Sequence, residues 1–385
     1  MKILNNKYFF FILLFASSMA FEACEKDDNI SGGIPEITYI RVTDPLSSDS
    51  LIVSAGQGSL IAIVGKNLAG ANQIWFNDQQ ASLTPTYISN NSILVTVPTQ
   101  IPKEINNVMT INFVNGQTLK HDFLVDISKP HIEGMNCEFV ATGNVATIRG
   151  DYFYPPLSVT FAGGVDAEIV DVTDKILQVR VPEGAKPGSI VVKTNFGEET
   201  SNFFFRDDRN IVLSSDPFSG WWNQALVVTE PGNDAPPKIN GNYIRVNEKI
   251  SGWQWKEVAG GPASAMGNIS KNIPDDAILN PQNYNLKFEL NTKKPYNNNM
   301  IKFNFGLNSE NNNAYLWKPP YDTRGEWQTI TIPFDELAKS YEEAGSKMTV
   351  NPDGYWTRIL FHGAGDLDCD ISFDNFRIVP KEIKK

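Results

Sequence analysis

Metal-binding and redox-active side chains are scarce in this sequence. Its 385 residues include three histidines and three cysteines, Cys24, Cys137 and Cys369, and no CxxC pair occurs. A zinc site needs Cys and His ligands at short, regular spacings, so the sequence argues against one. Cys137 and Cys369 lie in segments assigned below to different domains, which favours two buried free thiols over a disulfide between them.

Basic residues and catalytic motifs are also in short supply. Lys and Arg total 33 against 44 Asp and Glu, which gives a formal net charge of -11 at pH 7, and no basic stripe is present. Such a chain disfavours nucleic acids and other polyanions as ligands, so a neutral partner fits best. No GxSxG, P-loop or HExxH motif occurs, nor the Glu-x-Asp-x-x-Glu carboxylate pattern of one glycosidase type. These absences argue against an enzyme.

A long apolar run lies at the N-terminus. Tyr8–Phe15 follows Lys2 and Lys7 and precedes small residues and Cys24, which is the order of a secretory signal and too short for a spanning helix. The segment resembles a bacterial lipoprotein signal, and the acidic residues behind Cys24 resemble the surface-export signal of Bacteroidota lipoproteins. The resemblance implies a signal peptide over 1–23, acylation of Cys24, and a lipid anchor that holds the chain at the outer membrane, on the cell surface. Ordinary secretion with cleavage elsewhere stays open, and residues 24–33 are expected to form a tether.

The middle of the chain contains a repeat. The stretch "LIAIVGKNLAGANQIWFNDQQA" followed by "SILVTVP" is matched by "VATIRGDYFYPPLSVTFAGGVDA" followed by "ILQVRVP", and the intervals Gly65 to Pro98 and Gly150 to Pro182 are nearly equal. Each copy shows short runs of alternating polarity separated by Gly, Asn, Asp or Pro, with almost no helical periodicity. This pattern predicts two antiparallel β-sandwiches.

Both copies resemble the immunoglobulin-like IPT/TIG domain of plexins and transcription factors. The matching features are the "IWF" and "VTF" strands, the closing "VTVP" and "VRVP", and a turn formed by Gly65, Asn67 and Leu68 in one copy and Gly150, Asp151 and Phe153 in the other. The resemblance implies two Ig-like domains, over 34–127 and 128–206, and we expect them to act as spacers.

Residues 207–385 have a different composition. Seven of the eight tryptophans lie here, and long alternating runs occur at "YNLKFELNT", "MIKFNFGLN", "EWQTITIPF" and "CDISFDNFRIV". One short helix is expected at "FDELAKSYEEAG", with Asp335 and Glu336 near its start and Gly345 near its end. These features predict a larger, jelly-roll β-sandwich, so the whole chain is expected to be all-β.

Two segments of this domain carry a family resemblance. "WQTITIPFDEL" and "ISFDNFRIVP" look like the late strands of β-sandwich carbohydrate-binding modules. Together with the lipoprotein cysteine and the two Ig-like repeats, they make the chain resemble the second surface glycan-binding protein of Bacteroidota polysaccharide utilisation systems. The resemblance implies non-catalytic binding of a neutral polysaccharide, such as a β-1,3 glucan, a mixed-linkage glucan or xyloglucan, beside an outer-membrane glycan importer. A surface adhesin that recognises a host glycoprotein or a protein through the same domain is the alternative.

Sugar rings stack on flat aromatic side chains, and planar polar groups bind their hydroxyls. Trp317 is the preferred candidate, because it follows an Asn-rich run and precedes Pro319 and Pro320. Trp253 and Trp255 are expected on one face of a strand, where either sugar contact or a buried pair stays open. The full set of expected glycan-binding residues is Trp317, Trp253, Trp255, Tyr321, Tyr315, Trp222, Tyr296, Arg245 and Gln254. Trp327 is expected in the core, and Arg245 is either a binding residue or an ordinary surface charge.

No cofactor is expected, with one reservation. Asp366, Asp368 and Asp370 alternate in "GAGDLDCDIS" and are candidates for a structural Ca²⁺ site. The favoured interpretation is a solvated acidic edge strand that discourages pairing with other chains.

Overall fold

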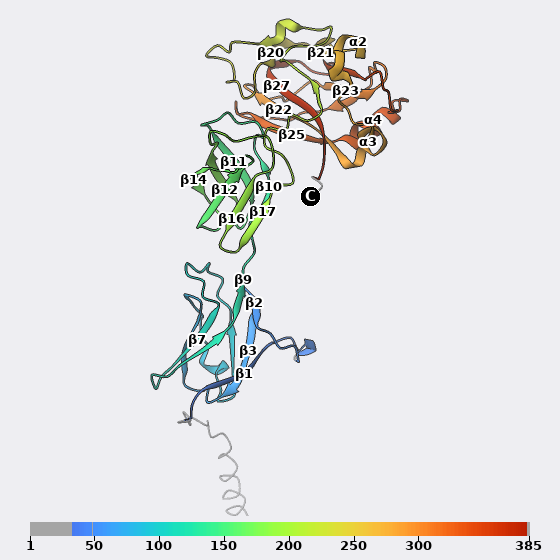
Figure 1. Cartoon of the computed structure of the whole chain (residues 1–385). Helices are drawn as coiled ribbons and strands as arrows, with labels where there is room; N and C mark the ends of the chain where they lie inside the picture. Colours follow the sequence, from blue (N-terminus) through green and yellow to red (C-terminus); the bar gives the residue numbers. More distant parts are fainter. Residues whose placement is uncertain (1–32, 48, 383–385) are drawn as a thin grey trace, which may run out of the picture. The chain divides into compact units, whose positions relative to one another are not determined.

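The computed structural model describes residues 33–47 and 49–382 (Figure 1). The predicted signal peptide, the acylation site Cys24 and most of the tether lie outside the described residues. Within these residues, no helix is long and apolar enough to cross a membrane. The chain divides into two compact units after Ile127.

The first unit is a β-sandwich with Ig-like character. Its core lies between the two larger sheets and contains Ile63, Ile74, Ile93 and Ile111, which are fully buried. One sheet has the order β1 (Glu36–Val42), β3 (Leu60–Lys66), β6 (Ser92–Thr96), and the other the order β5 (Gln79–Gln80), β4 (Ala71–Phe76), β7 (Val108–Phe113), β8 (Thr118–Asp122). A parallel pair, β2 (Ser54–Gly56) and β9 (Leu124–Asp126), completes it.

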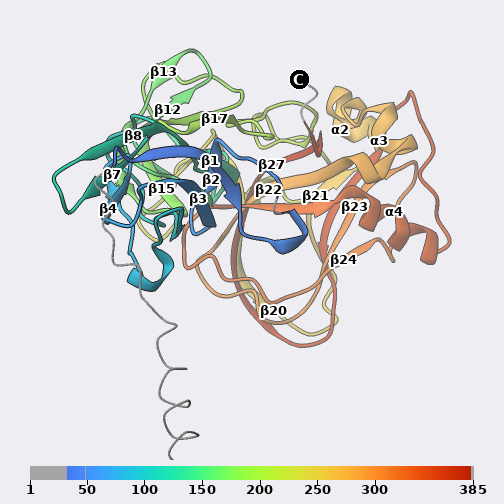
Figure 2. The same cartoon turned by 90° about the horizontal axis from the view of Figure 1, so that it is seen from below.

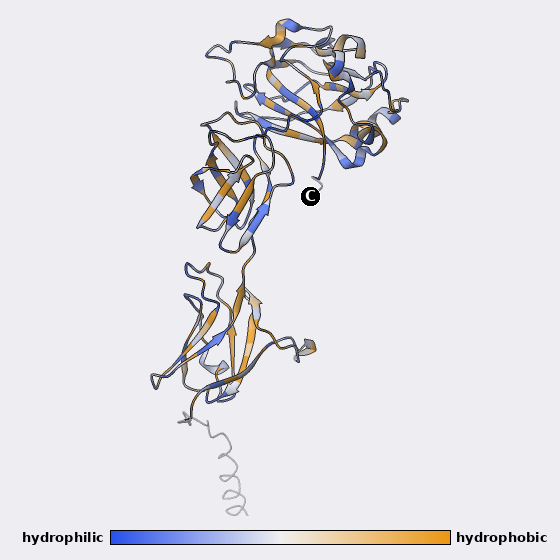
Figure 3. Cartoon of the chain, viewed as in Figure 1, coloured by the Kyte–Doolittle hydropathy of each residue, from blue (hydrophilic) through white to orange (hydrophobic). Residues whose placement is uncertain are grey.

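The second unit begins with a matching sandwich. One sheet has the order β10 (His131–Met135), β11 (Val145–Asp151), β15 (Ile176–Arg180), β14 (Glu168–Val172). The other has the order β13 (Val165–Asp166), β12 (Leu157–Phe161), β16 (Val191–Thr194), β17 (Gly197–Thr200). Buried and more exposed residues alternate along strands of both sandwiches, as in β7 and β11, because one face of each sheet is buried. Figure 3 shows the apolar stretches of these strands in orange.

Glycine is required at the repeated position for the same reason in both copies. A Cβ at Gly65 would lie 2.0 Å from the carbonyl oxygen of the paired strand, and a Cβ at Gly150 would lie 1.9 Å from its counterpart. Two residues later the backbone is left-handed, with φ of 59° at Asn67 and 63° at Tyr152. The shared sequence pattern therefore encodes one close strand approach followed by one turn.

The rest of the second unit is a larger two-sheet sandwich, the C-terminal domain. Its first sheet has the order β19 (Val227–Val228), β20 (Tyr243–Ile250), β27 (Leu367–Pro380), β22 (Tyr284–Thr292), β25 (Gln328–Pro333), with β18 (Ile211–Leu213) also paired to β27. Its second sheet has the order β21 (Lys256–Gly261), β26 (Trp356–Phe361), β23 (Ile301–Leu307), β24 (Tyr315–Trp317). The largest apolar cluster of the protein fills the space between them. The all-β prediction and the expected long strands are confirmed.

Three α-helices lie along one side of these sheets (Figures 1 and 2). The expected helix is confirmed as α4 (Phe334–Glu343), with Asp335 and Glu336 in its first turn and Gly345 at a φ of 81° beyond its end. The sequence analysis missed α2 (Ala263–Met266) and α3 (Asp275–Leu279). Each is about one turn long, too short to show an apolar period.

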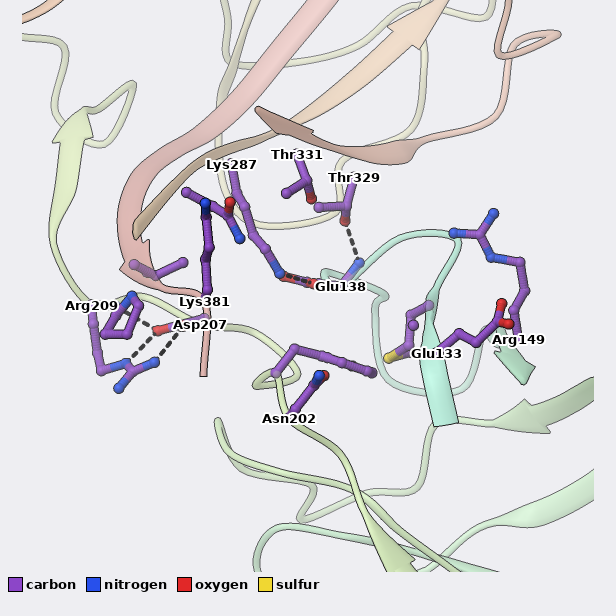
Figure 4. Close-up of a pocket in the computed structure, with 16 residues that line it drawn as sticks. Glu133, Glu138, Arg149, Asn202, Asp207, Arg209, Lys287, Thr329, Thr331 and Lys381 are labelled. Atoms are coloured by element: carbon purple, nitrogen blue, oxygen red, sulfur yellow. Dashed lines mark hydrogen bonds and ion pairs between the residues drawn. The ribbon is translucent and has the colours of Figure 1, made fainter. Parts of the chain in front are cut away.

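A buried charged cluster joins the second Ig-like domain to the C-terminal domain. Glu138 reaches across from the Ig-like domain and accepts hydrogen bonds from Arg377 at 2.6 Å and Lys287 at 2.5 Å. Arg377 also donates to Glu289 at 2.9 Å, and the backbone N–H of Glu138 donates to Thr329 at 2.7 Å (Figure 4 shows Glu138, Lys287 and Thr329). These ion pairs and hydrogen bonds cross between the two domains, which belong to one compact unit.

Apolar side chains complete this junction. Trp327, expected in the core, is buried against Cys137, Phe139 and Tyr243, and its indole N–H donates to a backbone carbonyl at 2.8 Å. Cys137 and Cys369 are buried free thiols, as predicted. Burial raises the pKa of both thiols, so they stay protonated and unreactive at neutral pH.

Candidate functional site

Aromatic side chains gather on the outer face of the sheet that contains β26. Three of them are unusually exposed for their size: Trp253 at 63%, Trp221 at 62% and Trp255 at 45%. Ring contacts within 6.0 Å link neighbouring members of two groups, one around His362 and one around Trp221. We call the whole set the aromatic row: Trp221, Trp222, Trp253, Trp255, Trp356 and His362.

The alternation of β26 fixes the axis of the row. Trp356, Arg358 and, just past the strand, His362 point outward, whereas Ile359 and Phe361 point into the core. Six residues of extended chain separate the first and last of these side chains, which corresponds to roughly 20 Å. The row therefore has the length of several sugar rings in line.

Trp253 and Trp255 enter the row from a turn that precedes β21. The prediction that they share one face of a strand is wrong, because Trp253 has a φ of 61° and β21 begins only at Lys256. They nevertheless come together, because both rings pack on His362, at centroid distances of 5.5 Å and 4.9 Å. The N–H of Trp253 donates to the carbonyl of Gly363 at 2.7 Å, which ties the turn to the end of β26.

A buried arginine joins the two groups of rings. The Arg358 guanidinium lies 4.9 Å from the centroid of the Trp255 ring and 5.4 Å from that of Trp222, at the distance of cation–π contacts. Glu257 and Glu310 both pair with this guanidinium. Glu257 also accepts a 2.8 Å hydrogen bond from the Trp255 indole N–H. The guanidinium beneath the row is thus paired on both sides, and the indole is held in place.

Lys302 and His362 are the polar residues beneath the ring group formed by Trp253 and Trp255. The Lys302 ammonium donates to Nδ1 of His362 at 3.1 Å and to the backbone carbonyl of Asn312 at 2.9 Å. Burial and the Lys302 charge lower the pKa of His362, and burial and Arg358 lower that of Lys302. His362 is therefore neutral at pH 7, with Nδ1 as acceptor and Nε2 as a donor.

The preferred candidate of the sequence analysis lies in the core. Trp317 is 2% exposed, and its ring packs against Phe303 and against Tyr321, which is half-buried. Tyr296 is fully buried and donates to the carbonyl of Trp317 at 2.7 Å. Tyr315 is half-buried and donates to Glu336 at 3.2 Å. The prediction that Trp317 and Tyr296 contact a sugar is wrong, because Trp317 lies on the inward face of β24; Tyr315 and Tyr321 pack beside the same core.

Arg245 and the three aspartates have structural partners. Arg245 lies on β20, in the other sheet, and donates to both oxygens of Asp370 at 2.8 Å and 2.9 Å, so its assignment to the site is wrong. Asp368 pairs with Lys294 at 2.7 Å, and β27 is a central strand rather than an edge. Among the residues described, no group of His, Cys, Asp or Glu is placed to hold a metal ion, which removes the structural calcium candidate.

Two further candidates lie at the aromatic row, and their contact with a sugar stays a prediction. Trp222 is a member, and Gln254, between Trp253 and Trp255, is exposed with its side-chain oxygen bonded to the N–H of Ser251 at 2.9 Å. Sequence reasoning missed Arg358, His362 and Lys302. The available signal was the alternation in "WTRILFH", which places Trp356, Arg358 and His362 on one face of a strand together with Leu360.

A polar pocket lies elsewhere, at the junction between the second Ig-like domain and the C-terminal domain. It has a volume of about 240 Å³ and the lining shown in Figure 4. Its charged groups bind one another, as in the Arg209–Asp207 pair at 2.8 Å and the Lys287–Glu138 pair. Phe203 is the single aromatic residue of its lining and is buried. This pocket has no flat ring on which a ligand could stack.

Flat exposed rings flanked by hydrogen-bonding side chains are suited to sugar rings, which offer a C–H face and a rim of hydroxyls. The fold and the aromatic row thus have the features of a carbohydrate-binding β-sandwich joined to Ig-like domains.

Comparisons with known proteins agree with this class. Residues 205–380 match the family model described as the surface glycan-binding protein B xyloglucan binding domain, and residues 47–123 match the IPT/TIG domain. These two segments belong to those families, and the chain has the domain composition of surface glycan-binding protein B from Bacteroidota.

Individual relatives share the whole architecture. The crystal structure of surface glycan-binding protein PbSGBP-B from Prevotella bryantii superimposes with a TM-score of 0.68 at 22% identity, covering 91% of this chain and 100% of that one. SGBP-B from a complex xyloglucan utilization locus in Bacteroides uniformis gives 0.50 at 20% identity, covering 90% and 100%. An IPT/TIG domain-containing protein of Bacteroides ovatus is 22% identical over 99% of both chains.

Proposed function

We propose that this protein is an outer-membrane lipoprotein that binds a neutral β-glucan, xyloglucan first among them, at the cell surface without chemical change. The exposure of Trp221, Trp253 and Trp255 on one sheet face carries the proposal. Large exposed apolar side chains are costly unless they meet a partner. The name of the family that matches residues 205–380 supports xyloglucan as the ligand.

The row offers both parts of sugar recognition. The exposed indoles provide rigid faces for pyranose C–H groups, and they lose little conformational entropy on binding. Gln254, Asn312 and Nε2 of His362 lie at the rim, where amide and imidazole groups can bind equatorial hydroxyls. An acidic protein repels polyanions, so the uncharged glucans remain the ligands of choice.

Binding without hydrolysis also agrees with the carboxylates at the row. A glycosidase needs one carboxylic acid to donate a proton and a second carboxylate to act on the anomeric carbon or on water. Glu257 and Glu310, which lie at the row, are both paired with Arg358. Both carboxylates are therefore engaged by one guanidinium beneath the row. The comparison proteins are named as glycan-binding proteins.

A lipid anchor at Cys24 would place many copies of the domain on one membrane. Several copies that bind one long polymer gain from effective concentration, so modest affinity at each row is enough to capture it. We propose an outer-membrane glycan importer as the working partner, on the basis of the resemblance to polysaccharide utilisation systems.

Affinity electrophoresis tests the proposal. The soluble mature chain, residues 25–385, is run through native gels that contain xyloglucan, mixed-linkage glucan, laminarin, mannan or starch. We expect retardation by one or more β-glucans and loss of retardation in Trp255→Ala. The control is Tyr87→Ala, because Tyr87 is an exposed aromatic residue of the first Ig-like domain. No retardation by any glycan would refute the proposal and favour an adhesin.

Localisation needs a separate test. The full-length protein and Cys24→Ser are expressed in a Bacteroidota host, and cell fractions and intact-cell protease digestion are compared. We expect the wild type in the outer membrane and open to protease, and the variant detached from it. Equal membrane retention of both would rule out anchoring at Cys24.

A further inference from the structure

A polar groove adjoins one end of the aromatic row. It has a volume of about 520 Å³ and is built from α2, the following 3-10 helix Gly267–Lys271, the end of β23, and the loop before β26. Trp356 belongs both to this lining and to the row, where its ring lies 5.9 Å from that of Trp221. The groove therefore continues the line of the outward residues of β26.

The groove presents unpaired hydrogen-bonding side chains. Within the described residues, the side chains of Ser264, Asn268, Lys271 and Asp353 make no hydrogen bond or ion pair, although all four are exposed at its wall. A carboxylate accepts two adjacent hydroxyls, and an ammonium or amide donates to others. This set lacks a further aromatic ring besides Trp356, so it suits the hydroxyl rim of a sugar rather than its C–H face.

The walls of the groove are fastened together. The carbonyl of Ser270 accepts the N–H of Tyr355 at 3.0 Å, and a Cβ at Gly354 would lie 2.2 Å from the Ser270 hydroxyl. Asn308 donates to the hydroxyl of Thr349 at 2.7 Å on the other side. A groove held open in this way loses little entropy when a ligand enters.

We propose that this groove is a terminal subsite for the glucan chain, in which Asp353 accepts hydrogen bonds from sugar hydroxyls and Lys271 and Asn268 donate to them, so that one or two sugar units are held beyond the aromatic row. The inference rests on the proposed function and deepens it. Stacking on the row depends little on which hydroxyls a sugar ring carries, whereas hydrogen bonds in the groove depend on their positions. The groove should therefore make affinity depend on the length of the glucan chain and on the identity of its sugar units.

Isothermal titration of the mature chain with a ladder of cello-oligosaccharides and with xylogluco-oligosaccharides tests this. Affinity should continue to rise with oligosaccharide length beyond the number of sugar units that the aromatic row alone can hold. Asp353→Ala should weaken binding of the longest oligosaccharides by about tenfold, the loss of a charge-assisted hydrogen bond, and leave the shortest unchanged. Asp208→Ala is the matched control, an exposed aspartate of the same domain outside the groove.

The outcomes separate the two proposals. Length-independent affinity, or an equal loss for short and long ligands in Asp353→Ala, overturns the subsite while the row stands. Wild-type protein that binds no oligosaccharide, and is not retarded by any glucan, overturns the proposed function and the subsite with it. Loss of the length effect in Asp353→Ala and in Lys271→Ala, with the control unchanged, supports the subsite.

Discussion

Replacement of Trp253 by glycine should weaken glucan binding strongly and lower stability only modestly. Trp253 holds a left-handed backbone, with a φ of 61°, that favours glycine, yet it carries a large exposed indole. A strained, exposed aromatic residue contributes little to folding, which supports the proposal that this ring contacts a ligand.

The magnitudes follow from the exposure. At 63% exposure about a third of the side chain is buried, so its loss costs ~2 kcal/mol, from ~90 Å² at ~25 cal/mol per Å². Relief of the left-handed strain returns ~1 kcal/mol, and glycine's extra chain entropy takes part of that back. The net destabilisation is ~1–2 kcal/mol. Loss of a stacking platform should cost at least ~2 kcal/mol of binding, or about 30-fold in Kd.

Calorimetric titration with the best β-glucan and urea unfolding measure the two quantities. Tyr152→Gly is the control, because Tyr152 is also an exposed aromatic residue with a positive φ, of 63°, but lies on the second Ig-like domain. It should change stability by a comparable amount and leave binding unaltered. An affinity of Trp253→Gly within about threefold of wild type would refute the assignment of this ring to the platform.

The other predictions concern the core, the pH response and the domain junction. Trp317→Ala should destabilise the C-terminal domain by ~3–5 kcal/mol in urea unfolding, and the fraction that stays folded should bind normally. Lost affinity at unchanged stability would show that Trp317 contacts the ligand instead of forming part of the core. Burial and the Lys302 charge lower the pKa of His362, so folding favours the neutral imidazole. Stability and binding should therefore hold at neutral pH and fall as the pH drops below 6.5. His362→Gln should remove this pH dependence in titrations over pH, and a pH profile of the variant identical to that of wild type would exclude His362 as its source. Glu138→Gln weakens the partner of buried Arg377 and should cost ~1.5–3 kcal/mol in thermal unfolding, whereas an unchanged Tm would show that the junction is held by apolar contacts alone.

The strands and their order follow from local sequence patterns. The repeat containing Gly65 and Gly150 encodes two similar sandwiches, because strand alternation and turn residues act over a few neighbours. For the same reason "FDELAKSYEEAG" predicted α4, and the alternating runs predicted β22, β23, β25 and β27. Trp327 was correctly placed in the core because it begins such a run.

The candidate site could be predicted only in part. The tryptophan-rich composition of residues 207–385 indicated an aromatic site in this domain, and Trp253 and Trp255 were among its candidates. Trp317 resembled them in sequence, with polar neighbours and prolines beside it. Its alternation with Tyr315 showed which residues share a face of β24, but not whether that face meets solvent or the opposite sheet.

The sequence by itself determined the fold class, the strands and a binding domain rich in indoles, because these depend on composition and on periods of two to four residues. The tertiary structure alone decided which rings face solvent. Trp221, Trp253 and Trp356 come from three separate segments of the chain. They lie at one sheet because β21 and β26 pair, because the N–H of Trp221 donates to the carbonyl of Gly260 on β21, and because the N–H of Trp253 donates to the carbonyl of Gly363 just past β26. Side-chain exposure depends on how the sheets pack across the whole domain, whereas a short-range pattern shows only which residues share a face of a strand.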